Sequence, residues 1–142
     1  MIPVRILHPD SEAPVAPREW LVSNGLGGYA CGTLAGPPIR RYHGWLVAAL
    51  PPPLGRTMLV NRLIETVHTA DGIGFTLGAG GDDDAQLVEF RLEWGLPVWR
   101  FRGGGCEIER RVVMEYGMNV THLRWRVLAG PCLSLTVQPW IQ

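Results

Sequence analysis

Lysine is absent from this sequence: all thirteen basic residues are arginine, and thirteen acidic residues balance them. The resulting formal net charge of zero creates no large field that would attract nucleic acid or an anionic membrane surface. Neither is therefore predicted as a partner. The missing lysine also removes the side chain that a phosphate-binding P-loop requires.

Long apolar runs are scarce as well. The longest, residues 45–50, ends in three prolines, and the first ten residues contain no cationic segment followed by an apolar run. The sequence therefore predicts no membrane span and no signal peptide, and we expect a cytoplasmic protein. Its 142 residues, 46% of them hydrophobic, suffice for one domain over 1–142 but not for two.

Cysteine is rare, and Cys31, Cys106 and Cys132 are odd in number and far apart, a pattern typical of reduced thiols rather than of a disulfide framework. The histidines are isolated from one another and from the cysteines, so no metal site is predicted. Three aspartates at 82–84 could in principle bind calcium. A solvated turn is expected there instead, because the other ligands of a calcium loop are not recognisable.

An apolar period of two dominates the second half of the chain. Val88, Phe90 and Leu92 alternate with charged residues, and the pattern recurs over 122–127 and 133–137. Less regular runs, separated by glycine or proline turns, occur at 45–49, 58–68, 74–77, 97–101 and 106–114. This spacing predicts an all-β fold, an antiparallel β-sandwich or barrel. Residues 58–69 would also suit a helical stripe, but we expect a strand.

Glycine is abundant and is concentrated in the segment 19–50. Such density indicates a loop of particular shape rather than a regular element. Gly25, Gly27 and Ala30 match a GxGxxA dinucleotide motif, but glycines and prolines obstruct the helix that must follow, and no acid lies between Glu19 and Glu65. We therefore expect no nucleotide site and no cofactor.

Paired carboxylates would be needed for glycosidic bond cleavage. Glu107 and Glu109 would share one face of a strand, as would Glu89 and Glu93. Arginines lie close to both pairs in sequence, which favours solvent-facing charges. No catalytic residue is therefore predicted.

The densest group of hydrogen-bond donors and aromatic faces is Arg40-Arg41-Tyr42-His43, followed by Trp45. This mixture suits a sugar, because planar donors can hold the ring hydroxyls and aromatic side chains can cover the apolar ring face. In an extended segment, Arg41, His43 and Trp45 would point one way and Tyr42 the other. The alternative is that the aromatics pack in the core or against another domain while the arginines form ion pairs.

Two motifs, NGLGGYA at 24–30 and RRYHG at 40–44, together with PPLGR at 52–56, resemble the opening of the bacterial and archaeal type of glycogen debranching enzyme, an amylo-α-1,6-glucosidase. The resemblance is strongest over 19–65 and continues more loosely to about Pro139. Cys31 stands where a small residue such as serine is usual in the family, and Trp45 where an aliphatic residue is common.

The resemblance implies an amino-terminal β-sandwich domain of the supersandwich, galactose-mutarotase-like class. In that family the chemistry belongs to a carboxy-terminal helical toroid, which these 142 residues do not include. The chain alone is accordingly expected to be inactive, with no catalytic carboxylate to carry over. The residues that we predict to contact an α-glucan are Asn24, Arg41, Tyr42, His43 and Trp45, with Gly25, Gly27 and Gly28 shaping the loop.

Three functions remain open at this point. The first is a non-catalytic domain of a glycogen debranching enzyme that supports the catalytic domain and shapes substrate binding. The second is an autonomous carbohydrate-binding module, for which exposed tryptophans would form a stacking platform. The third is a structural domain that forms a homo-oligomer or binds a protein partner through an aromatic surface.

Overall fold

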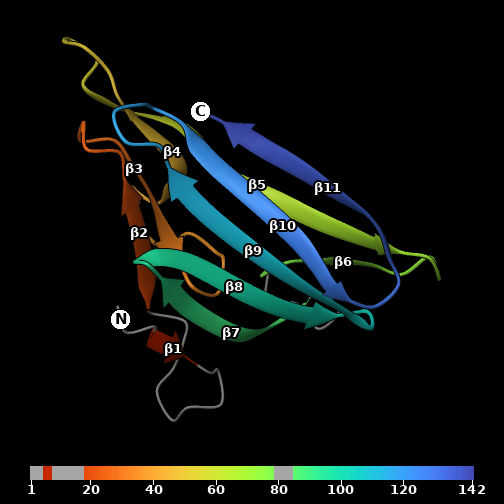
Figure 1. The fold of residues 1–142 in the computed structure, drawn as a ribbon. Coiled ribbons are helices and arrows are strands. Elements are labelled where there is room, and N and C mark those ends of the chain that lie inside the picture. Colours follow the sequence, from red (N-terminus) through yellow and green to blue (C-terminus); the bar gives the residue numbers. More distant parts are fainter. Residues whose placement is uncertain (1–4, 8–17, 79–84) are drawn as a thin grey trace.

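The structure is a computed structural model that describes residues 5–7, 18–78 and 85–142. These residues form eleven β-strands in two antiparallel sheets (Figure 1). The prediction of an antiparallel β-sandwich is confirmed. No helix long and apolar enough to cross a membrane occurs in these ranges. The aspartates at 82–84, predicted to form a solvated turn, lie outside them.

The first sheet has the strand order β1-β7-β8-β9-β10. Its strands are β1 (Arg5–Leu7), β7 (Gln86–Glu93), β8 (Leu96–Gly103), β9 (Cys106–Met114) and β10 (Thr121–Ala129). The strands from β7 to β10 follow one another as hairpins, because short turns containing glycine join them. We call this sheet A.

The second sheet, sheet B, has the order β11-β5-β4-β3-β2, with β6 also paired to β5. Its strands are β2 (Glu19–Ser23), β3 (Tyr29–Thr33), β4 (Gly44–Ala49), β5 (Arg56–Thr69), β6 (Gly74–Thr76) and β11 (Cys132–Ile141). The long strand β5 includes residues 58–69, which confirms the strand predicted there. The chain passes from sheet A to sheet B between β10 and β11, which are consecutive in sequence but belong to different sheets.

The core lies between the two sheets and is built around tryptophans. Trp20 of sheet B meets Trp99 of sheet A edge to face, with ring centroids 5.1 Å apart. Trp99 is fully buried, and its indole N–H donates to the carbonyl of Leu34 at 3.2 Å. Smaller buried residues on the inward faces of both sheets complete the cluster, among them Val22, Ala30, Val67, Phe90, Phe101, Ile108 and Val112. The inward alternation along each strand is what the period of two predicted.

Two features of the glycine-dense segment differ from the prediction. We expected a loop there, but β2 and β3 form a regular antiparallel hairpin in which Glu19 pairs with Thr33 and Ser23 with Tyr29. Within this segment, residues 24–28 form one loop and residues 34–43 form the connection between β3 and β4. Gly32 lies within β3, where its missing side chain leaves room for the Trp20 indole. Glycine therefore serves close packing as well as turn formation here.

The expectation of three unpaired thiols is wrong for two of them. Cys106 and Cys132 form a disulfide, with Cα atoms 6.1 Å apart, whereas Cys31 is free and buried. The first residue of β9 and the first residue of β11 meet because β10 runs back along β9 before the chain enters sheet B. Linear spacing gave no sign of this pairing.

Candidate functional site

The loop 24–28 is organised by the side chain of Asn24, which is completely buried. Its Oδ1 accepts hydrogen bonds from the backbone N–H groups of Leu26 and Gly28, at 2.9 and 3.0 Å. Its Nδ2 donates to the Met118 carbonyl and to Asn119 Oδ1, both at 3.0 Å. Because the amide uses both acceptor sites and both donors inside the protein, Asn24 would influence a ligand through the loop that it holds.

The same network connects this loop to two other parts of the chain. Asn119, in the turn before β10, donates to the Ala49 carbonyl at 2.8 Å and accepts from the Ala49 N–H at 2.9 Å. A Cβ placed on Gly28 would lie 2.6 Å from Asn24 Nδ2 and 2.9 Å from Asn119 Oδ1. Gly25 and Gly27 both have positive φ, 78° and 97°, which a non-glycine residue rarely adopts. The backbone at Gly25 and Gly27 thus favours glycine, and the packing at Gly28 leaves no room for a side chain.

The RRYHG segment lies between β3 and β4 as a turn rather than in extended form. His43 is 3% exposed, and its Nδ1 accepts the Ile39 backbone N–H at 3.2 Å. That hydrogen bond places the proton of the neutral ring on Nε2. Nε2 has no hydrogen-bond partner among the described residues, and its nearest acidic oxygen is Glu19 Oε2 at 3.5 Å. His43 is thus a buried ring whose Nε2 faces the Glu19 carboxylate.

Glu19 lies beside this turn and anchors it. Arg40 Nε forms an ion pair with Glu19 Oε1, and this hydrogen bond, more than any other interaction, lowers the pKa of Glu19. Tyr42 is half exposed, with its ring edge-on to His43 at a centroid distance of 5.5 Å. Arg41 is exposed and has no ion pair in the part of the chain that the structure describes.

A hollow of about 410 Å³ opens next to this turn on the surface. It is lined by Pro38, Ile39, Arg40, Arg41, His43, Asn61, Arg62, Trp140 and Gln142. Trp140 of β11 is half exposed. Three guanidinium groups and an indole therefore surround this outer hollow, and Glu19 neutralises only Arg40 among them.

A second hollow of about 250 Å³ extends inward from the first. The two share Pro38, His43, Asn61 and Arg62 as lining residues, so they lie next to each other, and we call them together the groove. The inner hollow is also lined by Trp20, Trp45, Glu65 and Arg110. The groove therefore passes from an arginine-rich mouth to an aromatic interior.

Arg110 and Glu65 form a buried ion pair at the inner end of the groove. Arg110 Nη1 lies 2.5 Å from Glu65 Oε2, and both residues are at most 3% exposed. The other carboxylate oxygen, Oε1, accepts the Trp125 indole N–H at 2.5 Å. The Arg110 guanidinium also lies over aromatic rings, 4.4 Å from the Trp99 centroid and 5.0 Å from that of Trp45, which stabilises its buried charge.

The structure brings three of the five predicted substrate residues into this groove. Arg41, His43 and Trp45 line it, Tyr42 packs on His43, and Asn24 belongs to the separate loop network. Sequence reasoning missed Glu65 and Arg110. The alternation of side chains along a strand could have identified them. Residues two positions apart face the same side, and the residues two positions before and after each of them are apolar and face inward.

A comparison with protein families adds to this geometry. The family model of the glycogen debranching enzyme N-terminal domain matches residues 18–142. The chain belongs to this family. No curated protein and no solved structure matches the chain. The suspected resemblance is therefore confirmed at the level of the family, and other domains are implied.

The carboxylate pairs considered from sequence lie on the outer face of sheet A in this debranching enzyme domain. Glu109 is 3% exposed, so the expectation of a solvent-facing charge is wrong for it. Burial alone would raise the pKa of Glu109, but hydrogen bonds from Arg111 and Arg91 outweigh burial and lower the pKa to about 2. Such a group stays ionised and cannot donate a proton as a general acid at neutral pH.

Metal binding has little support in the same part of the molecule. Across residues 5–7, 18–78 and 85–142, no group of three or more histidine, cysteine, aspartate or glutamate side chains could hold a metal ion. The cysteine nearest the groove, Cys31, lines the inner hollow, and burial raises the pKa of its thiol. The chemistry that this site offers is therefore hydrogen bonding and aromatic contact.

Proposed function

We propose that this domain is a non-catalytic part of a glycogen debranching enzyme and that it shapes the binding of an α-glucan through the groove. The observation that carries the proposal is the lining of the groove itself. Arg41 and Arg62 offer planar donors at the mouth, His43 lines both hollows, and Trp45 and Trp140 offer aromatic faces. Sugars are bound by this combination of directional donors and flat apolar surface.

The catalytic carboxylates are proposed to lie in another domain, a helical one that follows in the family. Glycoside hydrolysis needs one carboxyl group that is protonated near neutral pH and a second that is ionised. Glu65 and Glu109 are the buried carboxylates among the described residues, and arginine holds each of them. Arg111 and Arg91 hold the pKa of Glu109 at about 2, and the Glu65 oxygens already accept hydrogen bonds from Arg110 and Trp125.

The groove can be tested by titrating the purified chain with maltoheptaose and following binding by calorimetry. Arg41→Ala and Trp140→Ala are each expected to weaken binding by roughly tenfold, the equivalent of one charge-assisted hydrogen bond or one aromatic contact. The matched control is Arg56→Ala, which removes another exposed arginine, located away from the groove. Unchanged affinity in both groove variants would refute the groove as the binding site.

A separate measurement tests whether catalysis belongs to the helical domain rather than to this chain. The chain alone is expected to release no glucose from a branched dextrin, whereas the protein that includes the helical domain is expected to do so. If the chain alone hydrolyses the α-1,6 linkage, its proposed non-catalytic role is wrong.

A further inference from the structure

The hairpin between β7 and β8 contains an unusual residue at its tip. Glu93 pairs with Leu96, so Trp94 and Gly95 are the two residues of the turn, and their φ angles are 54° and 79°. Two consecutive positive φ values define the type I′ turn, whose preferred sequence is Asn-Gly. Gly95 is the residue that this turn prefers at its second central position. Trp94 is the only non-glycine residue with positive φ in the described part of the chain.

No contact among the described residues accounts for a tryptophan at this position. Bulky residues with positive φ are genuine outliers, since the Cβ crowds the backbone. Trp94 is also 79% exposed, and its ring contacts no other aromatic ring and makes no hydrogen bond within the described residues. The side chain thus combines backbone strain with exposure of a large apolar surface, and strain of this kind tends to accompany function.

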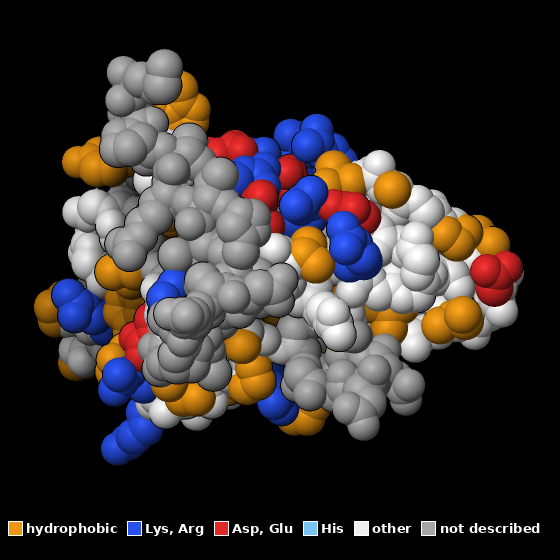
Figure 2. All heavy atoms as spheres, turned by 90° about the horizontal axis from the view of Figure 1, so that it is seen from below, with side chains coloured by type: hydrophobic (Ala, Val, Ile, Leu, Met, Phe, Trp, Pro, Cys, Tyr) orange, Lys and Arg blue, Asp and Glu red, His pale blue; other side chains and the backbone are white. Residues whose placement is uncertain are grey.

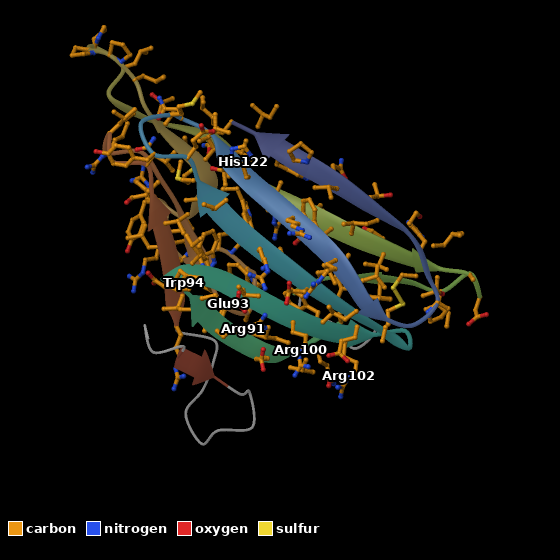
Figure 3. All side chains as sticks on the ribbon, in the orientation of Figure 1. Arg91, Glu93, Trp94, Arg100, Arg102 and His122 are labelled. Atoms are coloured by element: carbon orange, nitrogen blue, oxygen red, sulfur yellow. A yellow bond between two sulfur atoms is a disulfide. The ribbon has the colours of Figure 1, made fainter. Side chains whose placement is uncertain are left out.

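A hollow of about 280 Å³ lies beside Trp94 on sheet A. Val98, 1% exposed, is part of its lining, and Leu96 and Val113, each 37% exposed, lie on neighbouring strands. Polar side chains complete the lining: Glu93, Arg111, His122 and Arg124. Figure 3 shows Trp94 and Glu93 together at the β7–β8 turn, with His122 at the start of β10.

Ion pairs cover the neighbouring part of the outer face of sheet A. Register places Glu89, Arg100, Glu109 and Arg126 in one row across four strands. Arg91 contacts three glutamates in this lattice, Glu89, Glu93 and Glu109, at 2.6 to 2.8 Å. Figure 2 shows such interleaved acidic and basic side chains, with hydrophobic side chains beside them. The acidic and basic side chains pair with one another, and Glu93 and Arg111 of this lattice also line the hollow beside Trp94.

The chemistry of the hollow fits a neutral, hydroxyl-rich ring. Trp94 supplies an exposed aromatic face, Leu96 and Val113 supply partly exposed apolar surface, and the charged side chains of the rim can hydrogen-bond hydroxyl groups. A volume of about 280 Å³ is at the lower end of small-ligand pockets. It therefore suits a single sugar residue at the end of a chain better than a long segment.

We propose that Trp94 and this hollow form a second α-glucan binding site, on sheet A and separate from the groove. No lining residue is common to the two. Strand β9 contributes to both, but through different residues, Arg110 in the groove and Arg111 in this hollow. The ligand class rests on the proposed function, while the site itself rests on the strained and exposed tryptophan. A second site of this kind would hold a distant chain end of a branched glucan.

The decisive variant is Trp94→Asn, because asparagine is the residue that this turn prefers. The variant is expected to keep or raise the midpoint of thermal unfolding and to lose binding at this site, with affinity for maltoheptaose reduced roughly tenfold. Trp94→Phe keeps an aromatic ring and is expected to bind within about threefold of the original chain. An asparagine variant that is more stable and binds maltoheptaose at both sites as before would overturn the proposal.

Failure of this proposal can be told apart from failure of the groove. In Trp140→Ala the groove is impaired, so calorimetry with maltoheptaose measures binding at the Trp94 site. In Trp94→Asn that site is lost, so the same titration measures binding at the groove. Binding that survives Trp140→Ala and is lost in Trp94→Asn would support the second site and contradict the groove. The reverse result would contradict the second site and support the groove, and no binding in the unmodified chain would refute both.

Discussion

Arg110 of sheet A and Glu65 of sheet B meet inside the sandwich, with Arg110 Nη1 2.5 Å from Glu65 Oε2. Both are almost completely buried, yet the groove reaches them. Burying two charges costs desolvation that their attraction only partly offsets, unless further partners satisfy them. Trp125 donates to Glu65 and aromatic rings surround Arg110, whereas Arg110 Nε has no hydrogen-bond partner among the described residues. The pair therefore fixes how the two sheets face each other at the inner end of the groove.

Breaking this pair from one side is expected to destabilise the domain strongly. Arg110→Met leaves the Glu65 carboxylate buried without its counter-ion, which costs about 3–5 kcal/mol. The double variant Glu65→Gln with Arg110→Met is expected to be more stable than Arg110→Met alone, because no buried charge remains and the new amide oxygen can still accept the Trp125 N–H. Urea denaturation measures both. Arg102→Met, which removes an arginine that is 63% exposed, serves as the control and should cost about 0–1 kcal/mol.

The loop network makes a second prediction at Gly28. This glycine has no positive φ, so alanine is compatible with its backbone, but an added Cβ would lie 2.6 Å from Asn24 Nδ2. Gly28→Ala is therefore expected to displace the buried amides and to cost about 1–3 kcal/mol for their lost hydrogen bonds. Gly74→Ala is the matched control, since its nearest neighbour would be 3.5 Å away. Equal stability of the two variants would show that the Asn24 network is not rigid.

The sequence predicted the strands well and the tertiary relationships poorly, for a physical reason. Alternation at 106–114 and at 58–69 depends on neighbouring residues, and both strands were found. The Cys106–Cys132 disulfide and the Glu65–Arg110 pair depend on which strands come together across the sandwich, and local pattern carries no such information. For the groove, composition found the RRYHG cluster, whereas Trp140 entered only through the return of β11 along β5.

Glu109 should make the stability of the domain depend on acid pH. Its pKa is lowered from 4.5 to about 2 in the folded chain, where Arg111 Nε and Arg91 Nη2 donate to it at 2.7 and 2.8 Å. A carboxyl group with a lowered folded pKa stabilises the fold above its unfolded pKa and loses that effect as the pH falls towards the folded value. The loss is therefore expected between about pH 4.5 and pH 2.

The matched variants for this titration are Glu109→Gln and Glu115→Gln. Glu109→Gln is expected to be less stable than the original chain at pH 7, with a gap that narrows towards pH 2 because the original carboxyl group is then protonated as well. Glu115 is half exposed on the surface, so its replacement should change stability little at either pH. Urea denaturation at several pH values gives the comparison. A gap for Glu109→Gln that stays constant with pH would contradict the assignment.

The disulfide leads to the last prediction, because Cys106 and Cys132 join the starts of β9 and β11 over a sequence separation of 26 residues. Closing a loop of this length restricts the unfolded chain and stabilises the folded one by about 3 kcal/mol. Dithiothreitol should therefore lower the midpoint of thermal unfolding of the original chain and of Cys31→Ser, which keeps the disulfide. Cys132→Ser should already unfold at the lower temperature and show no response to the reductant. If Cys31→Ser loses the response instead, or if the original chain never responds, the link between sheets A and B does not contribute to stability as argued.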